Sequence, residues 1–126
     1  SQEVLSIFKQ ALTDADLEDG LMLVPISEMA DRDALSQVAD FLLPTEGVKI
    51  VVTYGVRMSK VILSVRSNDD SINVGKLLAN TFEKGSAGGH KALAGGQIPF
   101  DELGCESPDE AMKSITKILK TTFGGE

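Results

Sequence analysis

A glycine-rich segment with one histidine and one lysine carries the strongest chemical signal in this 126-residue sequence. Five of the twelve glycines lie within residues 85–96, and His90 and Lys91 directly follow the pair Gly88-Gly89. Consecutive glycines let backbone N–H groups converge on one point, and imidazole and ammonium donors beside them strengthen the attraction for an anion. The segment therefore predicts an anion-binding loop, with a short helix near Lys91 as a further source of N–H donors. An ordinary glycine-rich turn is the alternative.

Other reaction chemistries lack the residues that they need. A P-loop starting at Gly85 would require glycine where His90 stands. The acidic run from Asp14 resembles a calcium loop, but Asp19 replaces its glycine and Pro25 its bidentate glutamate. One histidine cannot supply a zinc or two-metal site. We therefore predict no catalytic residue and no metal ligand in this chain.

Composition and charge indicate what kind of protein this is and where a ligand would bind. The chain carries a net charge of −7 and 42% hydrophobic residues, and no apolar run approaches the roughly 20 residues of a membrane span. The single Cys105 fits a reducing compartment, so we expect a cytoplasmic protein without membrane contact. Charge is uneven, because residues 46–100 hold seven bases against four acids. An anion is expected to bind in this middle segment. The alternative is that the excess of basic residues is a chance feature of a mixed surface.

The pattern of apolar residues predicts one α/β domain, a mixed sheet of about four to five strands with helices packed on it. The chain lacks a methionine at Ser1 and begins at once with helical spacing, which predicts an excised piece. We expect residues 1–19 to form a linker helix and an acidic loop, and residues 20–126 to form the domain. The first helix is predicted to bury a stripe of five residues: Val4, Ile7, Phe8, Ala11 and Leu12.

A buried strand is predicted at residues 21–24, ended by Pro25, followed by a helix capped by Asp31 or Asp33 and stopped by Pro44. The buried face of this helix is predicted to hold four apolar residues: Leu35, Val38, Ala39 and Leu42.

Residues 47–55 and 58–66 predict a β-hairpin with a tight turn. In its second strand Val61, Leu63 and Val65 form a core face, and the opposite face carries Lys60, Ser64 and Arg66 as its polar members.

The rest of the chain is predicted to form a helix, a strand and a last helix. Ser71 is expected to cap the first of these helices, and residues 97–100 to form the strand. Ser107 followed by Pro108 and Glu110 is typical of a helix N-terminus, and Gly124 is typical of its end.

The segment Gly88-Gly89-His90-Lys91-Ala92-Leu93-Ala94-Gly95-Gly96 resembles the glycine-glycine-histidine motif of the DHH-associated domain. This is the C-terminal domain of DHH phosphoesterases, a family that includes RecJ-like exonucleases and nano-RNases. Val65-Arg66-Ser67 looks like the family's arginine-serine signature, and the order of elements over residues 20–100 is similar as well. One departure is a longer loop, since Phe82 is followed by five residues before the glycine pair.

The resemblance implies a substrate-binding role for Arg66, Ser67, the pair Gly88-Gly89, His90 and Lys91. Arg66 would bind a phosphate and share one site with His90. The implied partners are a nucleotide or short single-stranded nucleic acid and an N-terminal DHH catalytic domain, with a homodimer left open. That catalytic domain would hold manganese or magnesium; this chain lacks the Asp-His-His motif and is expected to hold no cofactor. The parent protein would be a metal-dependent phosphoesterase.

Two other functions stay open. One is an RNA-binding appendage like the C-terminal domain of alanyl-tRNA synthetase, which usually lacks a histidine after its glycines. The other is an oligomerisation module that senses an anion. The sequence does not select among oligoribonucleotide, single-stranded DNA, cyclic dinucleotide, phosphoadenosine phosphate and polyphosphate.

Overall fold

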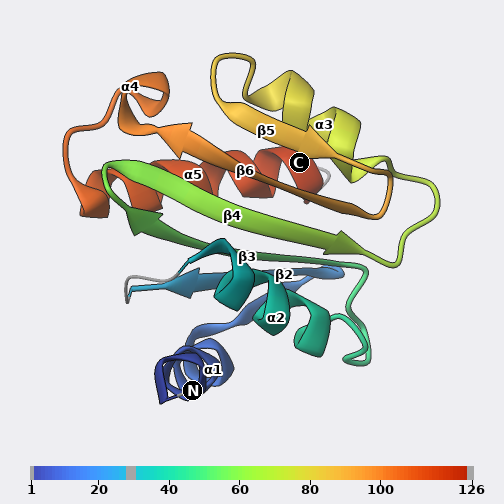
Figure 1. Cartoon of the computed structure of the whole chain (residues 1–126). Helices are drawn as coiled ribbons and strands as arrows, with labels where there is room; N and C mark the ends of the chain where they lie inside the picture. The colour runs from blue at the N-terminus through green and yellow to red at the C-terminus, as the bar shows by residue number, and fades with distance from the viewer. Residues whose placement is uncertain (1, 28–30, 125–126) are drawn as a thin grey trace.

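The computed structural model describes residues 2–27 and 31–124. Its centre is one mixed sheet of six strands in the order β1-β2-β3-β4-β6-β5, with helices on both faces (Figure 1). The elements in chain order are α1 (Gln2–Asp14), β1 (Asp16–Glu18), β2 (Leu21–Ile26), α2 (Arg32–Leu42), β3 (Ile50–Arg57), β4 (Lys60–Ser67), α3 (Val74–Thr81), β5 (Ser86–Gly89), β6 (Leu93–Pro99), α4 (Phe100–Leu103) and α5 (Pro108–Phe123). The predicted α/β class is confirmed, with more strands than the four to five expected.

Two hydrophobic cores lie on the two faces of the sheet. On one face α3 and α5 cover the strands, with Leu78, Ile115 and Leu119 fully buried. On the other face α1 and α2 pack against β2, β3 and β4 around Ile7 and Leu35. The sheet is mixed because β2 and β3 run parallel while the other neighbouring pairs are antiparallel.

The predicted β-hairpin is confirmed as β3 and β4. Met58 and Ser59 form its turn with φ values of 52° and 61°, a two-residue turn of the kind that matches strand twist. The face of β4 predicted to be polar is more enclosed than the sequence indicated, because α2 covers it. Ser64 is 1% exposed and Arg66 is 8% exposed, while Lys60 stays at the surface.

The N-terminal half departs from the sequence prediction in three places. Residues 16–18 of the predicted acidic loop form the short edge strand β1. The strand β2 continues through Pro25 to Ile26, since β1 pairs only with residues 21–23 and leaves this stretch of β2 at the sheet edge. Leu12 is 68% exposed and does not belong to the buried stripe of α1.

Helix caps were predicted well where the capping residue and the apolar pattern agree. Asp31 caps α2 by accepting from the N–H of Ala34, and the four predicted apolar residues of this helix are buried. Ser107 caps α5 as expected. The cap of α3 is Asn73 and not Ser71.

No helix in residues 2–27 and 31–124 has the length and apolar character to cross a membrane. The contact of α1 with β2 and α2 is part of the second core. The division of the chain at residue 20 stays a prediction.

Candidate functional site

The predicted site residues gather at one end of the sheet, which we call the turn end. The strand β4 ends there with Arg66 and Ser67, beside the turn between β5 and β6. The N–H of Ser67 donates to the carbonyl of Ala92 over 2.9 Å, and the N–H of His90 donates to that of Leu93 over 2.8 Å. Leu93 is the register partner of Arg66. Backbone pairing therefore brings the arginine-serine and glycine-histidine signatures together.

The same turn closes the N-terminus of α3. The N–H of Val74 donates to the carbonyl of Lys91 and the N–H of Gly75 to that of His90, each over 3.0 Å. These carbonyls occupy helix N–H groups that would otherwise face solvent or an anion. No helix begins near Lys91, so that expectation is wrong. The side chains of His90 and Lys91 are exposed.

Gly88 and Gly89 form part of a strand and not a convergent anion loop, so the predicted loop conformation is wrong. They pair with Gly95 and Ala94 of β6. Their φ values of 149° and 150° favour glycine, and a Cβ on Gly89 would stand 2.6 Å from the carbonyl oxygen of Leu93. Glycine has low strand propensity, so pairing with β6 overrides the local preference of this pair.

Gly75 fixes how closely α3 approaches β5. A Cβ on Gly75 would overlap the carbonyl group of Gly89 and crowd the carbonyl oxygen of His90. The motifs that predicted the site do not include this residue. An isolated glycine within a helical pattern is the signal that could have found it, because such a glycine usually has a packing reason.

Arg66 is anchored inside the protein and not displayed on the surface. Its Nε donates to Oδ1 of Asp40 on α2 over 2.7 Å, and its Nη1 donates to the carbonyl of Val65 over 3.0 Å. Within the described ranges, no hydrogen bond joins Nη2 to a protein acceptor. Asp40 lies 26 residues away in sequence, and no pattern in the chain pointed to it.

Ser67 orders the loop that follows β4. Its Oγ accepts from the N–H of Asp69 over 3.0 Å, and Asp69 in turn accepts from the hydroxyl and the N–H of Ser71. The two hydrogen bonds from Ser71 lower the pKa of Asp69, and the charges of Lys49 and Lys91 lower it further. The turn end thus carries an ionised carboxylate near Lys91. The predicted substrate contacts of the six site residues stay predictions.

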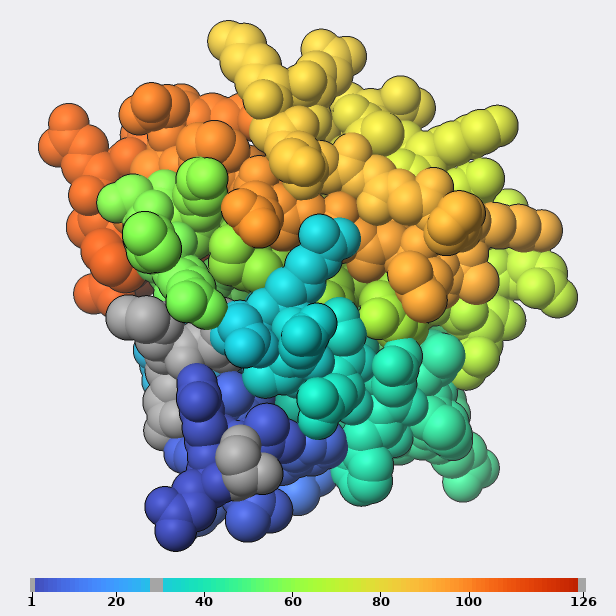
Figure 2. All heavy atoms as spheres, in the orientation of Figure 1, coloured from blue at the N-terminus to red at the C-terminus, as the bar shows by residue number. Residues whose placement is uncertain are grey.

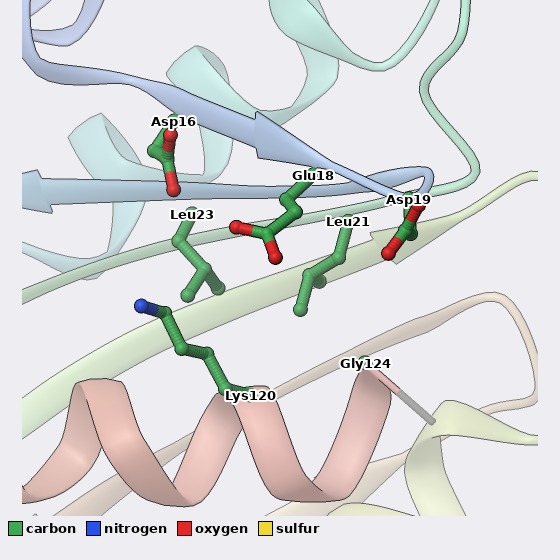
Figure 3. A pocket seen from close by; sticks show the side chains of 7 residues that line it. All are labelled: Asp16, Glu18, Asp19, Leu21, Leu23, Lys120 and Gly124. Carbon is green, nitrogen blue, oxygen red and sulfur yellow. The ribbon is translucent and has the colours of Figure 1, made fainter. Parts of the chain in front are cut away.

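A separate small pocket lies between α5 and the edge strand β1 (Figure 3). Asp16, Glu18 and Asp19 line it, and Lys120 reaches toward them from α5. Three carboxylates against one ammonium repel a phosphate, so this pocket does not suit the predicted ligand. In the part of the chain that the structure describes, no group of three or more His, Cys, Asp or Glu side chains is arranged to hold a metal ion.

The chain is similar to known proteins in both sequence and fold. Residues 19–125 match the DHHA1 domain. The chain belongs to the DHHA1 domain family. A curated relative, an uncharacterized protein of Methanocaldococcus jannaschii, is 30% identical over 118 residues, which is 93% of this chain. The DHHA1 chain spans 24% of that relative's length.

Solved structures show the same fold at low sequence identity. An exopolyphosphatase-related protein from Bacteroides fragilis superposes with a TM-score of 0.71 at 16% identity, over 96% of this DHHA1 chain and 35% of that chain. The C-Ala domain of Aquifex aeolicus alanyl-tRNA synthetase superposes with a TM-score of 0.61 at 20% identity. The match covers 86% of this DHHA1 chain and 96% of the C-Ala chain. A pGpG-specific phosphodiesterase, PggH from Vibrio cholerae, superposes with a TM-score of 0.56 at 16% identity. The match covers 93% of this DHHA1 chain and 39% of the phosphodiesterase chain.

Proposed function

We propose that this DHHA1 domain binds the phosphorylated end of a nucleotide or short single-stranded nucleic acid. A DHH catalytic domain of the same parent protein, with manganese or magnesium bound there, would then hydrolyse the substrate. The DHHA1 domain would orient the phosphate and would not catalyse the reaction by itself. The family match supports this division of labour, since the relatives with similar folds include an exopolyphosphatase-related protein and a pGpG-specific phosphodiesterase.

One observation carries the proposal: Arg66 and the turn containing His90 and Lys91 meet at one end of the sheet. Arg66 is held by Asp40 and by the Val65 carbonyl, so its guanidinium loses little conformational freedom when it receives a phosphate. His90 and Lys91 are exposed donors on a turn whose backbone is fixed against α3. Charge-assisted hydrogen bonds of this type contribute about 1.5–3 kcal/mol each.

The test compares binding of a nucleoside 5′-monophosphate with binding of the matching nucleoside. We expect measurable binding of the monophosphate only, and a loss of about tenfold when His90 is changed to Ala, as one charge-assisted bond is removed. Lys113→Ala on α5 is the matched control, because Lys113 is an exposed base far from the turn end. Equal binding of nucleoside and monophosphate, or an unchanged affinity in the His90 variant, would exclude the proposal.

Salt and strandedness give an independent check. Few phosphate contacts predict a shallow salt dependence and no preference for long duplex DNA. If duplex DNA competed at physiological salt as well as a short single strand, the proposed ligand class would be wrong.

A second candidate function rests on the likeness to the C-Ala domain. The match extends over 96% of the C-Ala chain. In this alternative the DHHA1 domain would bind a structured RNA. Binding of transfer RNA that is stronger than binding of a short phosphorylated strand would favour it.

A further inference from the structure

A basic groove lies on the α2 side of the sheet, at the opposite end of β4 from Arg66. It is a cavity of about 420 Å³ between the start of α2, the β3–β4 turn and β6. Its lining residues are Asp31, Arg32, Arg57, Met58, Lys60, Ile62 and Gln97. In Figure 2 the start of α2, in cyan, extends over the orange surface of β6, and the light green β3–β4 turn lies beside it.

The charges around the basic groove are not balanced. Three of its lining residues, Arg32, Arg57 and Lys60, are bases. In residues 2–27 and 31–124, none of the three forms an ion pair, whereas Arg66 pairs with Asp40. The carboxylate of Asp31 accepts the N–H of Ala34 as the cap of α2. In a chain of net charge −7, this gathering of cations around one cavity favours an anionic ligand.

Arg32 lies directly on the bare backbone of β6. A Cβ added to Gly95 would stand 2.9 Å from Nη2 of Arg32 and 3.4 Å from its Nε. Any side chain at this position would displace the guanidinium. Because Gly95 has no side chain, the Arg32 guanidinium can pack against the backbone of β6 beside the groove. This packing role of Gly95 is separate from the turn end.

The basic groove and the side chain of Arg66 lie on the same face of the sheet. Arg66 pairs with Leu93, Ser64 with Gly95 and Ile62 with Gln97, so alternate residues of both strands face α2. Arg66 lies six positions after Lys60, which corresponds to about 20 Å along a strand at roughly 3.3 Å per residue. An extended anionic chain that starts at the turn end and follows β6 would pass Arg32 and then reach Lys60.

We propose that the basic groove is a second phosphate subsite, which holds a phosphodiester of a single-stranded oligonucleotide several nucleotides from the end bound at the turn end. This inference rests on the proposed function and adds a site to it. The lining of the groove also includes Met58, Ile62 and Gln97, beside the three basic side chains. Apolar and amide groups contact the faces and edges of nucleobases. An inorganic polyphosphate chain offers neither, so an oligonucleotide is the better match.

The test uses the 126-residue chain with Arg57→Glu and Lys60→Glu combined. Both residues flank an exposed turn and leave Met58 and Ser59, with their positive φ values, unchanged. The probes are 5′-phosphorylated single-stranded oligonucleotides of one, two, four and six residues, as RNA and as DNA. For the native chain we expect affinity to rise with length. In the variant we expect hexamer binding to weaken at least tenfold and mononucleotide binding to change less than twofold.

The matched control is Lys113→Glu with Lys117→Glu, the same change of charge on α5 at the opposite face of the sheet. We expect hexamer affinity in this control to fall less than threefold. Equal losses in the two variants would show a diffuse charge effect and overturn the subsite. Should the glutamate variant lose its native circular dichroism spectrum, Arg57→Gln with Lys60→Gln replaces it, with the same length-dependent loss expected.

Failure of this inference is distinguishable from failure of the proposed function. Unchanged hexamer binding in the groove variant, with His90-dependent mononucleotide binding intact, would overturn the subsite alone. Mononucleotides that bind no better than nucleosides, with hexamer binding still lost in the groove variant, would support the groove and exclude binding at the turn end. Tighter binding of inorganic polyphosphate than of the hexamer, with the same dependence on Arg57 and Lys60, would overturn the oligonucleotide assignment.

Discussion

The Nε of Arg66 donates to Oδ1 of Asp40 over 2.7 Å, and this ion pair ties the end of β4 to α2. The arginine side chain is 10% exposed and the aspartate side chain 64% exposed. An arginine predicted to bind phosphate is thus paired with a carboxylate that is more exposed than the guanidinium itself. Asp40 has two opposite effects, since it positions the guanidinium and also repels an approaching anion.

Replacing Asp40 with Asn separates these two effects. Asn retains an oxygen that can accept from Nε but removes the negative charge. We expect nucleoside monophosphate to bind roughly two- to fivefold more tightly, as one like charge is removed near a partly solvated site. Titration calorimetry at low salt measures the change, and Asp33→Asn on the exposed side of α2 is the control. Weaker binding in Asp40→Asn would mean that positioning outweighs repulsion.

Gly75→Ala tests the close contact between α3 and β5. The new methyl group would overlap the Gly89 carbonyl, and the backbone must shift to admit it. We expect a loss of about 1–3 kcal/mol in the free energy of unfolding, as for other overpacked sites. Urea denaturation measures it, with the exposed Lys76→Ala on the same helix as a control expected to stay within about 0.5 kcal/mol. A fully stable Gly75 variant would show that this approach is not required.

Ser71→Ala tests the side-chain hydrogen bond that contributes most to lowering the pKa of Asp69. Because Asp69 ionises more readily in the folded state, it stabilises the fold above the ordinary carboxyl pKa of about 3.9. This contribution is lost as the pH falls through the lower pKa of the folded state. We expect the variant to raise the pKa of Asp69, as measured by NMR titration of its carboxyl group. The stability difference between variant and native chain should be present at pH 7 and vanish in acid. Because the backbone N–H of residue 71 still donates to Asp69 in the variant, the pKa should rise only part of the way to its ordinary value. An Asp69 pKa equal to that of the native chain would contradict this account.

Tyr54→Phe tests a buried hydroxyl between β3 and α5. The hydroxyl of Tyr54 lies 2.7 Å from Oγ1 of Thr116, whose own proton is donated to the carbonyl of Met112, so Tyr54 is the donor. We expect a loss of about 1 kcal/mol in the free energy of unfolding, the usual value for one hydrogen bond. Denaturation in urea gives the value, and no loss would mean that the bond contributes nothing net.

The same residue predicts a decline of stability at high pH. Burial raises the pKa of Tyr54 above its ordinary value of about 10, so the unfolded chain ionises first. The contribution of Tyr54 to stability should be constant below about pH 10 and fall above it, and the fall in stability should be smaller in Tyr54→Phe. The chain has one tyrosine, so phenolate absorbance reports this residue alone. Ionisation of Tyr54 at its ordinary pKa in the folded chain would contradict the prediction.

Local and strongly patterned features could be predicted from the sequence. The hairpin formed by β3 and β4, the buried face of α2 and the two ends of α5 follow from alternation, helical spacing and capping residues. These signals depend on residues close together in the chain, so no knowledge of distant contacts was needed. The resemblance to the DHH-associated domain also came from short motifs, at Arg66-Ser67 and at Gly88-Gly89-His90.

The tertiary structure decided what distant segments do to one another. The glycine pair at 88–89 lacks strand propensity and became a strand only because β6 supplies its hydrogen bonds and Gly75 lets α3 approach. Asp40 and Arg32, both on α2, lie against Arg66 of β4 and Gly95 of β6. Such pairs leave no periodic trace in the sequence, because their partners are set by the packing of elements far apart in the chain. Sequence alone thus determined the family motifs and most elements, and packing alone determined which charged side chains are paired and which stay exposed.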